Sequence, residues 1–113
     1  MRKRTYEFIA DPGHGWLKVS LKEFEKAIKD CDDDFGCSYI SSNFKNVFLE
    51  EDCDASKFLK LSGHLKDDGK LKDHISMKIR YTKGYARLRG YQRYSYYVAW
   101  RNEMLNKIKE IVN

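Results

Sequence analysis

The stretch Tyr6-Glu7-Phe8-Ile9-Ala10-Asp11-Pro12-Gly13-His14-Gly15-Trp16-Leu17-Lys18-Val19-Ser20 contains two short segments of strand-like character on either side of a sharp break. The first segment covers residues 6–10 and the second covers residues 16–19. Proline and glycine interrupt regular structure, so residues 11–15 are predicted to form the connection. The stretch therefore predicts two β-strands joined by a turn.

A helix start signal follows the second predicted strand. Ser20 is a favourable N-cap, and Glu23 three residues later completes a capping box. The apolar residues at helical spacing are Leu21, Phe24, Ala27 and Ile28. The run Cys31-Asp32-Asp33-Asp34 carries negative charge, which is unfavourable beside a helix C-terminus. We therefore expect the helix to end near this run, which becomes a loop.

The middle of the chain is typical of a second hairpin followed by a short helix. Residues 37–40 and 47–50 are predicted as paired strands around a turn at residues 42–46. Asp54 is the next plausible N-cap. The helix that it would open carries Phe58, Leu59 and Leu61. Residues 66–70 are predicted to be an exposed loop.

The last predicted element is a long helix from about Ser95 to Val112. Its apolar stripe consists of Val98, Leu105, Ile108 and Val112, widened by Trp100, Met104 and Ile111. The 113 residues fit one domain, and neither a repeat nor a linker divides them. The prediction is a single α+β domain over residues 1–113: a small antiparallel sheet of hairpins, two to three helices and a long C-terminal helix.

The segment from Ile75 to Tyr91 is predicted to form a basic hairpin. A two-residue turn at Lys83-Gly84 would place apolar side chains on one face and cations on the other. Arg80 would then lie opposite Arg87, and such like-charge pairs destabilise a hairpin unless an anion binds there. The predicted partner-binding residues in and just after this hairpin are Lys78, Arg80, Tyr85, Arg87, Arg89, Tyr91 and Arg93.

Charge is unevenly distributed along the chain, whose formal net charge is +5. Residues 30–54 contain eight acids and one base, whereas residues 75–102 contain seven bases and no acid. The basic face would accept a nucleic-acid backbone, an acidic protein surface or the chain's own Asp32–Asp34 run. A solvated face is the plain alternative. The tyrosines between residues 81 and 97 suit both base stacking and protein interfaces, so they do not discriminate.

The sequence contains no GxSxG, HExxH or P-loop motif. His14 and the acidic cluster Glu50–Asp54 support a small metal-dependent hydrolase only as a third hypothesis. The residues that could ligate zinc are Cys31, Cys37, Cys53, His14, His64 and His74. None of them has the CxxC or HxxxH spacing of a recognisable site, so we assign no catalytic residue, metal or cofactor. The odd number of cysteines indicates free thiols.

Two segments of the chain carry a resemblance. The stretch from Asp11 to Val19 and the stretch Phe48-Leu49-Glu50-Glu51-Asp52-Cys53-Asp54-Ala55 resemble the paired DPGHGWL and YLEEDCDA motifs of a family of short phage and mobile-element proteins. The resemblance covers about residues 5–94, and this chain departs from it with Phe48 in place of the tyrosine. It implies a phage or mobile-element context but no activity. Small phage proteins of this kind often bind host machinery, including restriction and CRISPR systems.

The leading functional prediction is a non-enzymatic, anti-CRISPR-like binding protein that occludes a host defence or nucleic-acid-handling complex. The partner would be a host protein or a protein–nucleic-acid complex, bound through the basic, tyrosine-rich hairpin. Direct nucleic-acid binding is the first alternative, and the small hydrolase is the second. The apolar runs are too short to span a membrane, so we expect a cytoplasmic protein of the host cell.

Overall fold

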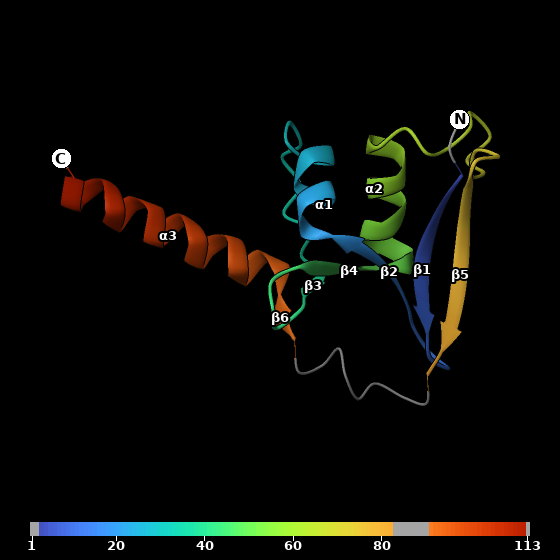
Figure 1. Cartoon of the computed structure of the whole chain (residues 1–113), viewed down its shortest axis with the longest axis horizontal. Helices are drawn as coiled ribbons and strands as arrows, with labels where there is room; N and C mark the ends of the chain where they lie inside the picture. Colours follow the sequence, from blue (N-terminus) through green and yellow to red (C-terminus); the bar gives the residue numbers. More distant parts are fainter. Residues whose placement is uncertain (1–2, 83–90, 113) are drawn as a thin grey trace.

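The structure, a computed structural model, describes residues 3–82 and 91–112. These residues form a six-stranded sheet in the order β5-β1-β2-β4-β3-β6 (Figure 1). The strands are β1 (Arg4–Ala10), β2 (Gly15–Ser20), β3 (Tyr39–Ile40), β4 (Asn46–Glu50), β5 (Ile75–Tyr81) and β6 (Gln92–Arg93). The helical elements are α1 (Leu21–Ala27), the π-helical turn η1 (Glu51–Ala55), α2 (Ser56–Leu61) and α3 (Tyr94–Val112). The predicted α+β class and the long C-terminal helix are confirmed.

The sheet is mixed, because β5 runs parallel to β1, with Tyr6 opposite Met77. The other strand pairs are antiparallel, as the sequence predicted for the whole sheet. The parallel pair has a topological cause. After α2 the chain returns to the start of β1, where the Arg4 amide donates to the His74 carbonyl over 2.7 Å. Such a parallel pairing needs a long crossover, which the segment through η1 and α2 provides.

The main core lies between the sheet and the helices α1 and α2, which cover the same face of the sheet (Figure 1). Phe24 of α1 and Phe58 of α2 are fully buried there, together with Phe35 from the acidic loop, residues 28–38 between α1 and β3. The rings of Phe24 and Phe35 meet edge to face, with centroids 5.0 Å apart. A smaller cluster of Ile9, Trp16 and Phe48 forms a second apolar group.

The two predicted helix caps have different outcomes. Ser20 caps α1 as predicted, and its hydroxyl accepts a hydrogen bond from the Glu23 amide over 3.2 Å. The Glu23 carboxylate contacts Arg4 and Tyr6 instead of completing the predicted capping box. Asp54 does not cap α2, because it lies inside η1 and its side chain is fully buried. The Ser38 hydroxyl donates to the Asp54 carboxylate over 2.5 Å, so this carboxylate serves a buried contact instead of a helix end.

The helix α3 leaves the body of the molecule and projects away from the sheet (Figure 1). Its 19 residues correspond to about 28 Å of helix, more than the body can cover. Tyr94 is buried and Tyr97 and Val98 pack against the core, whereas Ile108 and Ile111 are 54% and 81% exposed. The predicted stripe therefore reaches the core only through its first turns. No helix in the described residues is long and apolar enough to cross a bilayer.

Candidate partner-binding surface

Phe44 occupies the tip of the β3–β4 turn in a backbone conformation that phenylalanine rarely adopts. Its φ is 58°, which lies in the left-handed region. The turn holds this conformation through several hydrogen bonds: the Phe44 amide donates to the Ser41 carbonyl over 2.9 Å, and the Lys45 amide donates to Asn43 Oδ1 over 3.0 Å. Strained residues of this kind cluster at functional sites. The residue is 46% exposed.

The Phe44 ring packs against the aromatic residues in the first half of α3. Its centroid is 5.4 Å from that of Tyr97 and 6.4 Å from that of Trp100, with both pairs stacked. Trp100 itself is 51% exposed. The contact therefore extends the aromatic surface of α3 onto the β3–β4 turn, and the rings remain accessible to a partner.

The aromatic surface continues along α3 as an apolar stripe. We define the helix stripe as Tyr97, Trp100, Met104, Ile108 and Ile111, whose spacing of three and four residues places them on one face of the helix. Leu105 flanks it and is 49% exposed. Groups of exposed apolar side chains are candidates for interaction sites.

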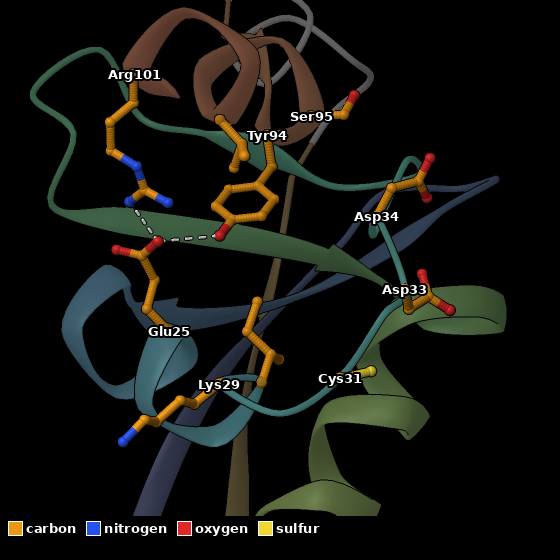
Figure 2. Close-up of a pocket in the computed structure, with 10 residues that line it drawn as sticks. Glu25, Lys29, Cys31, Asp33, Asp34, Tyr94, Ser95 and Arg101 are labelled. Atoms are coloured by element: carbon orange, nitrogen blue, oxygen red, sulfur yellow. Dashed lines mark hydrogen bonds and ion pairs between the residues drawn. The ribbon is translucent and has the colours of Figure 1, made fainter. Parts of the chain in front are cut away.

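Glu25 of α1 fixes the base of α3 to the body. Its carboxylate accepts a hydrogen bond from the Tyr94 hydroxyl over 3.1 Å and pairs with the Arg101 guanidinium over 2.5 Å. Figure 2 shows these contacts in an open groove between α1, the acidic loop and α3. Burial and the Glu25 charge raise the pKa of Tyr94 above its usual range, so this hydroxyl keeps its proton and its hydrogen bond.

The structure separates the predicted partner-binding residues that it describes. Lys78 and Arg80 lie on β5 at one edge of the sheet, whereas Tyr91 and Arg93 lie at or beside β6 at the opposite edge. Five strand spacings correspond to about 24 Å. The other predicted residues, Tyr85, Arg87 and Arg89, and the Lys83-Gly84 turn lie outside the described residues.

Two of these cations already have partners within the chain. Arg80 pairs with Glu7 over 3.0 Å, and Lys18 approaches the same carboxylate at 3.7 Å. Arg93 donates to the Gly36 carbonyl over 2.9 Å, and its guanidinium lies over the Tyr39 ring. The described part of the predicted basic surface is therefore partly neutralised or occupied.

The turn that contains His14 is organised by Asp11. One Asp11 carboxylate oxygen accepts from the amides of Gly13 and His14, over 2.9 and 2.7 Å. Burial opposes ionisation of Asp11, but these hydrogen bonds and the nearby His14 ring lower its pKa on balance. The His14 ring stacks on Trp16 with centroids 5.5 Å apart. These contacts give Asp11 and His14 a structural role in holding the turn between β1 and β2.

The residues considered as zinc ligands do not come together as one group. His64 shares a hydrogen bond with the Tyr6 hydroxyl over 2.8 Å, and Cys31 lines the groove of Figure 2. Cys37 and Cys53, in contrast, lie beside each other and beside Asp54. Sequence spacing gave no signal for this group, because its members come from two separate segments.

The sequence predicted most residues of the helix stripe, but it did not predict that their side chains would be exposed. Amphipathic periodicity predicts which residues share a face, and the helix stripe follows that pattern. The contribution of Phe44 was missed altogether, since a phenylalanine in a five-residue turn is also compatible with burial. No family model, curated protein or solved structure matches the chain.

Proposed function

We propose that this chain is a small, non-enzymatic binding protein of phage or mobile-element origin. It acts in the host cytoplasm, where it occludes a protein component of a defence or nucleic-acid-handling complex. The principal contact is made by Phe44 and the helix stripe. The basic residues of the 75–91 segment add electrostatic attraction to the same complex.

The observation that carries this proposal is the row of apolar side chains from Phe44 along α3, most of which are exposed. Trp100 and Ile108 are 51% and 54% exposed on a helix that projects from the body. Burying the side chain of a large apolar residue contributes about 1.5–3 kcal/mol, so several such residues supply substantial binding energy. Tryptophan and tyrosine are also the residue types that dominate binding energy at protein interfaces.

The composition of the surface favours a protein partner over nucleic acid. The outer part of the helix stripe is aliphatic, and aliphatic side chains neither stack on bases nor contact phosphate. Arg101, whose guanidinium lies over the Tyr97 ring, is paired with Glu25. An amphipathic helix that inserts its apolar face into a groove of the partner fits these features best.

The experiment is a pull-down from host lysate with the tagged full chain, washed at low and high salt, with and without nuclease. We expect a defined host protein to be retained under all conditions. Ile108→Glu should abolish its capture, because the change buries a charge in the interface. Asn106→Glu is the matched control, since it adds the same charge on the other side of α3 and should leave capture unchanged.

Three outcomes would contradict the proposal. Equal capture by the Ile108→Glu and Asn106→Glu variants would remove the helix stripe from the interface. Recovery of nucleic acid alone, lost at high salt, would favour the direct nucleic-acid binder, because phosphate contacts release counterions. Sedimentation of the purified chain as a dimer that Ile108→Glu converts to a monomer would assign the surface to a second copy.

A further inference from the structure

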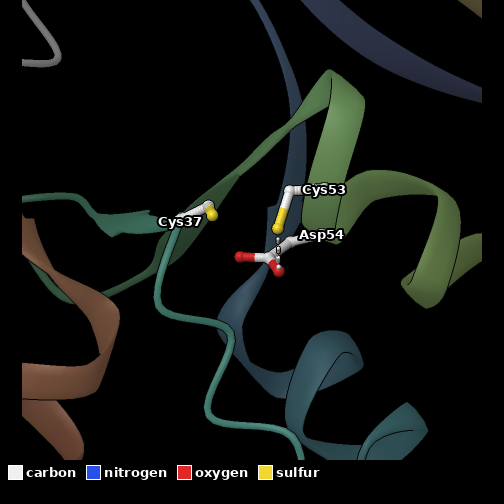
Figure 3. A group of neighbouring side chains, drawn as sticks. All are labelled: Cys37, Cys53 and Asp54. Atoms are coloured by element: carbon white, nitrogen blue, oxygen red, sulfur yellow. Dashed lines mark hydrogen bonds between the residues drawn. The ribbon is translucent and has the colours of Figure 1, made fainter.

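A second group of side chains lies apart from the partner-binding surface. Cys37 precedes β3, and Cys53 and Asp54 belong to η1. Each offers one potential ligand atom, and the three atoms lie within 4.8 Å of one another. Figure 3 shows the three side chains pointing toward one another across the gap between the two segments.

The chain holds these side chains in a defined arrangement. The Ser38 hydroxyl donates to Asp54 Oδ2 over 2.5 Å, and the Cys53 thiol donates to Asp54 Oδ1 over 3.3 Å. One carboxylate oxygen is thus fixed by a serine, and the other faces sulfur. Asp54 is fully buried. The π-helical geometry of η1 is rare, and where it occurs it is frequent at functional sites.

The distances are close to those of a tetrahedral metal site. Zinc binds thiolate sulfur at about 2.3 Å and carboxylate oxygen at about 2.0–2.2 Å, so its ligand atoms stand about 3.5–3.8 Å apart. The separation of 3.3 Å between Cys53 Sγ and Asp54 Oδ1 is already near this value. The remaining separations need to close by no more than about 1 Å from 4.8 Å.

The charges of these side chains also suit a divalent cation. Two thiolates and one carboxylate around such an ion sum to one negative charge. Lys57 Nζ lies 3.7 Å from Asp54 Oδ1 and 2.6 Å from Asp33 Oδ2, so an ammonium stands between the group and its acidic neighbour. Thiolates do not suit Mg²⁺ or Ca²⁺, which take oxygen ligands, and the carboxylate disfavours Cu(I).

We propose that Cys37, Cys53 and Asp54 bind a Zn²⁺ ion, with water as the fourth ligand. Ser38 is the positioning residue that orients the carboxylate, as outer-shell hydrogen bonds do at metal sites. The ion would tie the segment before β3 to η1 and would release the protons of both thiols to solvent. This inference is independent of the identity of any binding partner.

The test uses the metal-free full chain, kept reduced with a non-thiol reductant. Titration with Zn²⁺ in a calorimeter should show one equivalent bound. Co²⁺ in place of Zn²⁺ should give thiolate-to-cobalt charge-transfer absorption and the intense visible bands of a tetrahedral ion. Cys37→Ser and Cys53→Ser should abolish both signals. Cys31→Ser is the matched control and should retain them, because Cys31 lies outside the group.

A folding defect would not obscure the result. Cys37 is only half-buried, so Cys37→Ser should keep the circular dichroism spectrum of the parent chain and still lose the cobalt absorption. The proposal is overturned if the parent chain binds no stoichiometric Zn²⁺. It is also overturned if the Cys37→Ser and Cys53→Ser variants bind zinc as the parent does, which would indicate an adventitious ion only.

Discussion

The ring of Phe44 stacks on the ring of Trp100, with centroids 6.4 Å apart and planes inclined by 14°. This contact joins the tip of the β3–β4 turn to the projecting helix α3. It is made by a residue whose φ of 58° is unfavourable for a phenylalanine. The strained backbone conformation therefore places a partly exposed ring against the first half of α3.

Phe44→Gly separates the role of the ring in folding from its role in binding. Glycine relieves about 1–2 kcal/mol of left-handed strain, while loss of the aromatic contacts costs a similar amount. We expect the free energy of unfolding to change by less than about 1 kcal/mol and partner affinity to fall at least about tenfold. Phe44→Tyr keeps the ring and should keep the affinity. A Phe44→Gly variant that binds as tightly as the parent would exclude the turn from the interface.

Gly15 lies close to two side chains that would have to move to admit a Cβ. A Cβ at this position would stand 2.4 Å from Phe8 Cζ and 2.5 Å from Glu51 Oε2. Gly15→Ala should therefore destabilise the chain by about 1–3 kcal/mol in urea denaturation. Gly13→Ala is the control, because the nearest atom to its Cβ would be 4.0 Å away. Equal stability of the two variants would contradict the close packing at Gly15.

Stability should decline in alkaline solution because two buried tyrosines resist ionisation. Burial, followed by the neighbouring carboxylates Glu23 and Glu25, raises the pKa of Tyr6 and Tyr94 above the usual value. In the unfolded chain a tyrosine ionises near pH 10. Because the folded-state values are higher, the stabilisation is complete below about pH 10 and is lost as the pH rises further.

The Tyr94 contribution can be measured with Tyr94→Phe, which should flatten the fall in melting temperature above about pH 10. The exposed Tyr96 provides the matched control, and Tyr96→Phe should leave the pH profile unchanged. A steeper fall in the Tyr94→Phe variant than in the parent would contradict the assignment.

Ser38→Ala should destabilise the chain because it removes a hydrogen bond to a buried carboxylate. Ser38 and Asp54 are both fully buried, and hydrogen bonds to charged groups contribute about 1.5–3 kcal/mol. Urea denaturation with a metal chelator present measures this loss without any contribution from zinc. Ser42→Ala, at an exposed position of the β3–β4 turn, should have little effect. A loss as small as that of Ser42→Ala would contradict the role of Ser38.

The local signals in the sequence predicted most elements of the fold. The Ser20 cap, the hairpin between β3 and β4 and the helix from Tyr94 onward all follow from capping, turn chemistry and periodicity, which act over a few residues. The parallel pairing of β5 with β1 could not be predicted in this way. Alternation does not distinguish parallel from antiparallel neighbours, and the partner strand is far away in the sequence.

The candidate sites were harder to predict than the fold, because they depend even more on contacts between segments that are far apart in the sequence. Asp54 has the sequence signature of an N-cap, but Ser38 draws its carboxylate into the interior. Cys37 and Cys53 approach each other only because the segment before β3 passes η1. The exposure of the helix stripe depends on the direction in which α3 leaves the sheet, which no property of the helix itself specifies.

The projection of α3 divides the chain into residues that maintain the fold and residues that the fold does not need. Substitutions at Ile108 or Ile111 change a surface that makes almost no contribution to the packed interior. Selection can therefore alter the outer turns of this helix rapidly without loss of folded protein. Under the proposed function, a partner that changes its own surface would face a protein able to follow that change.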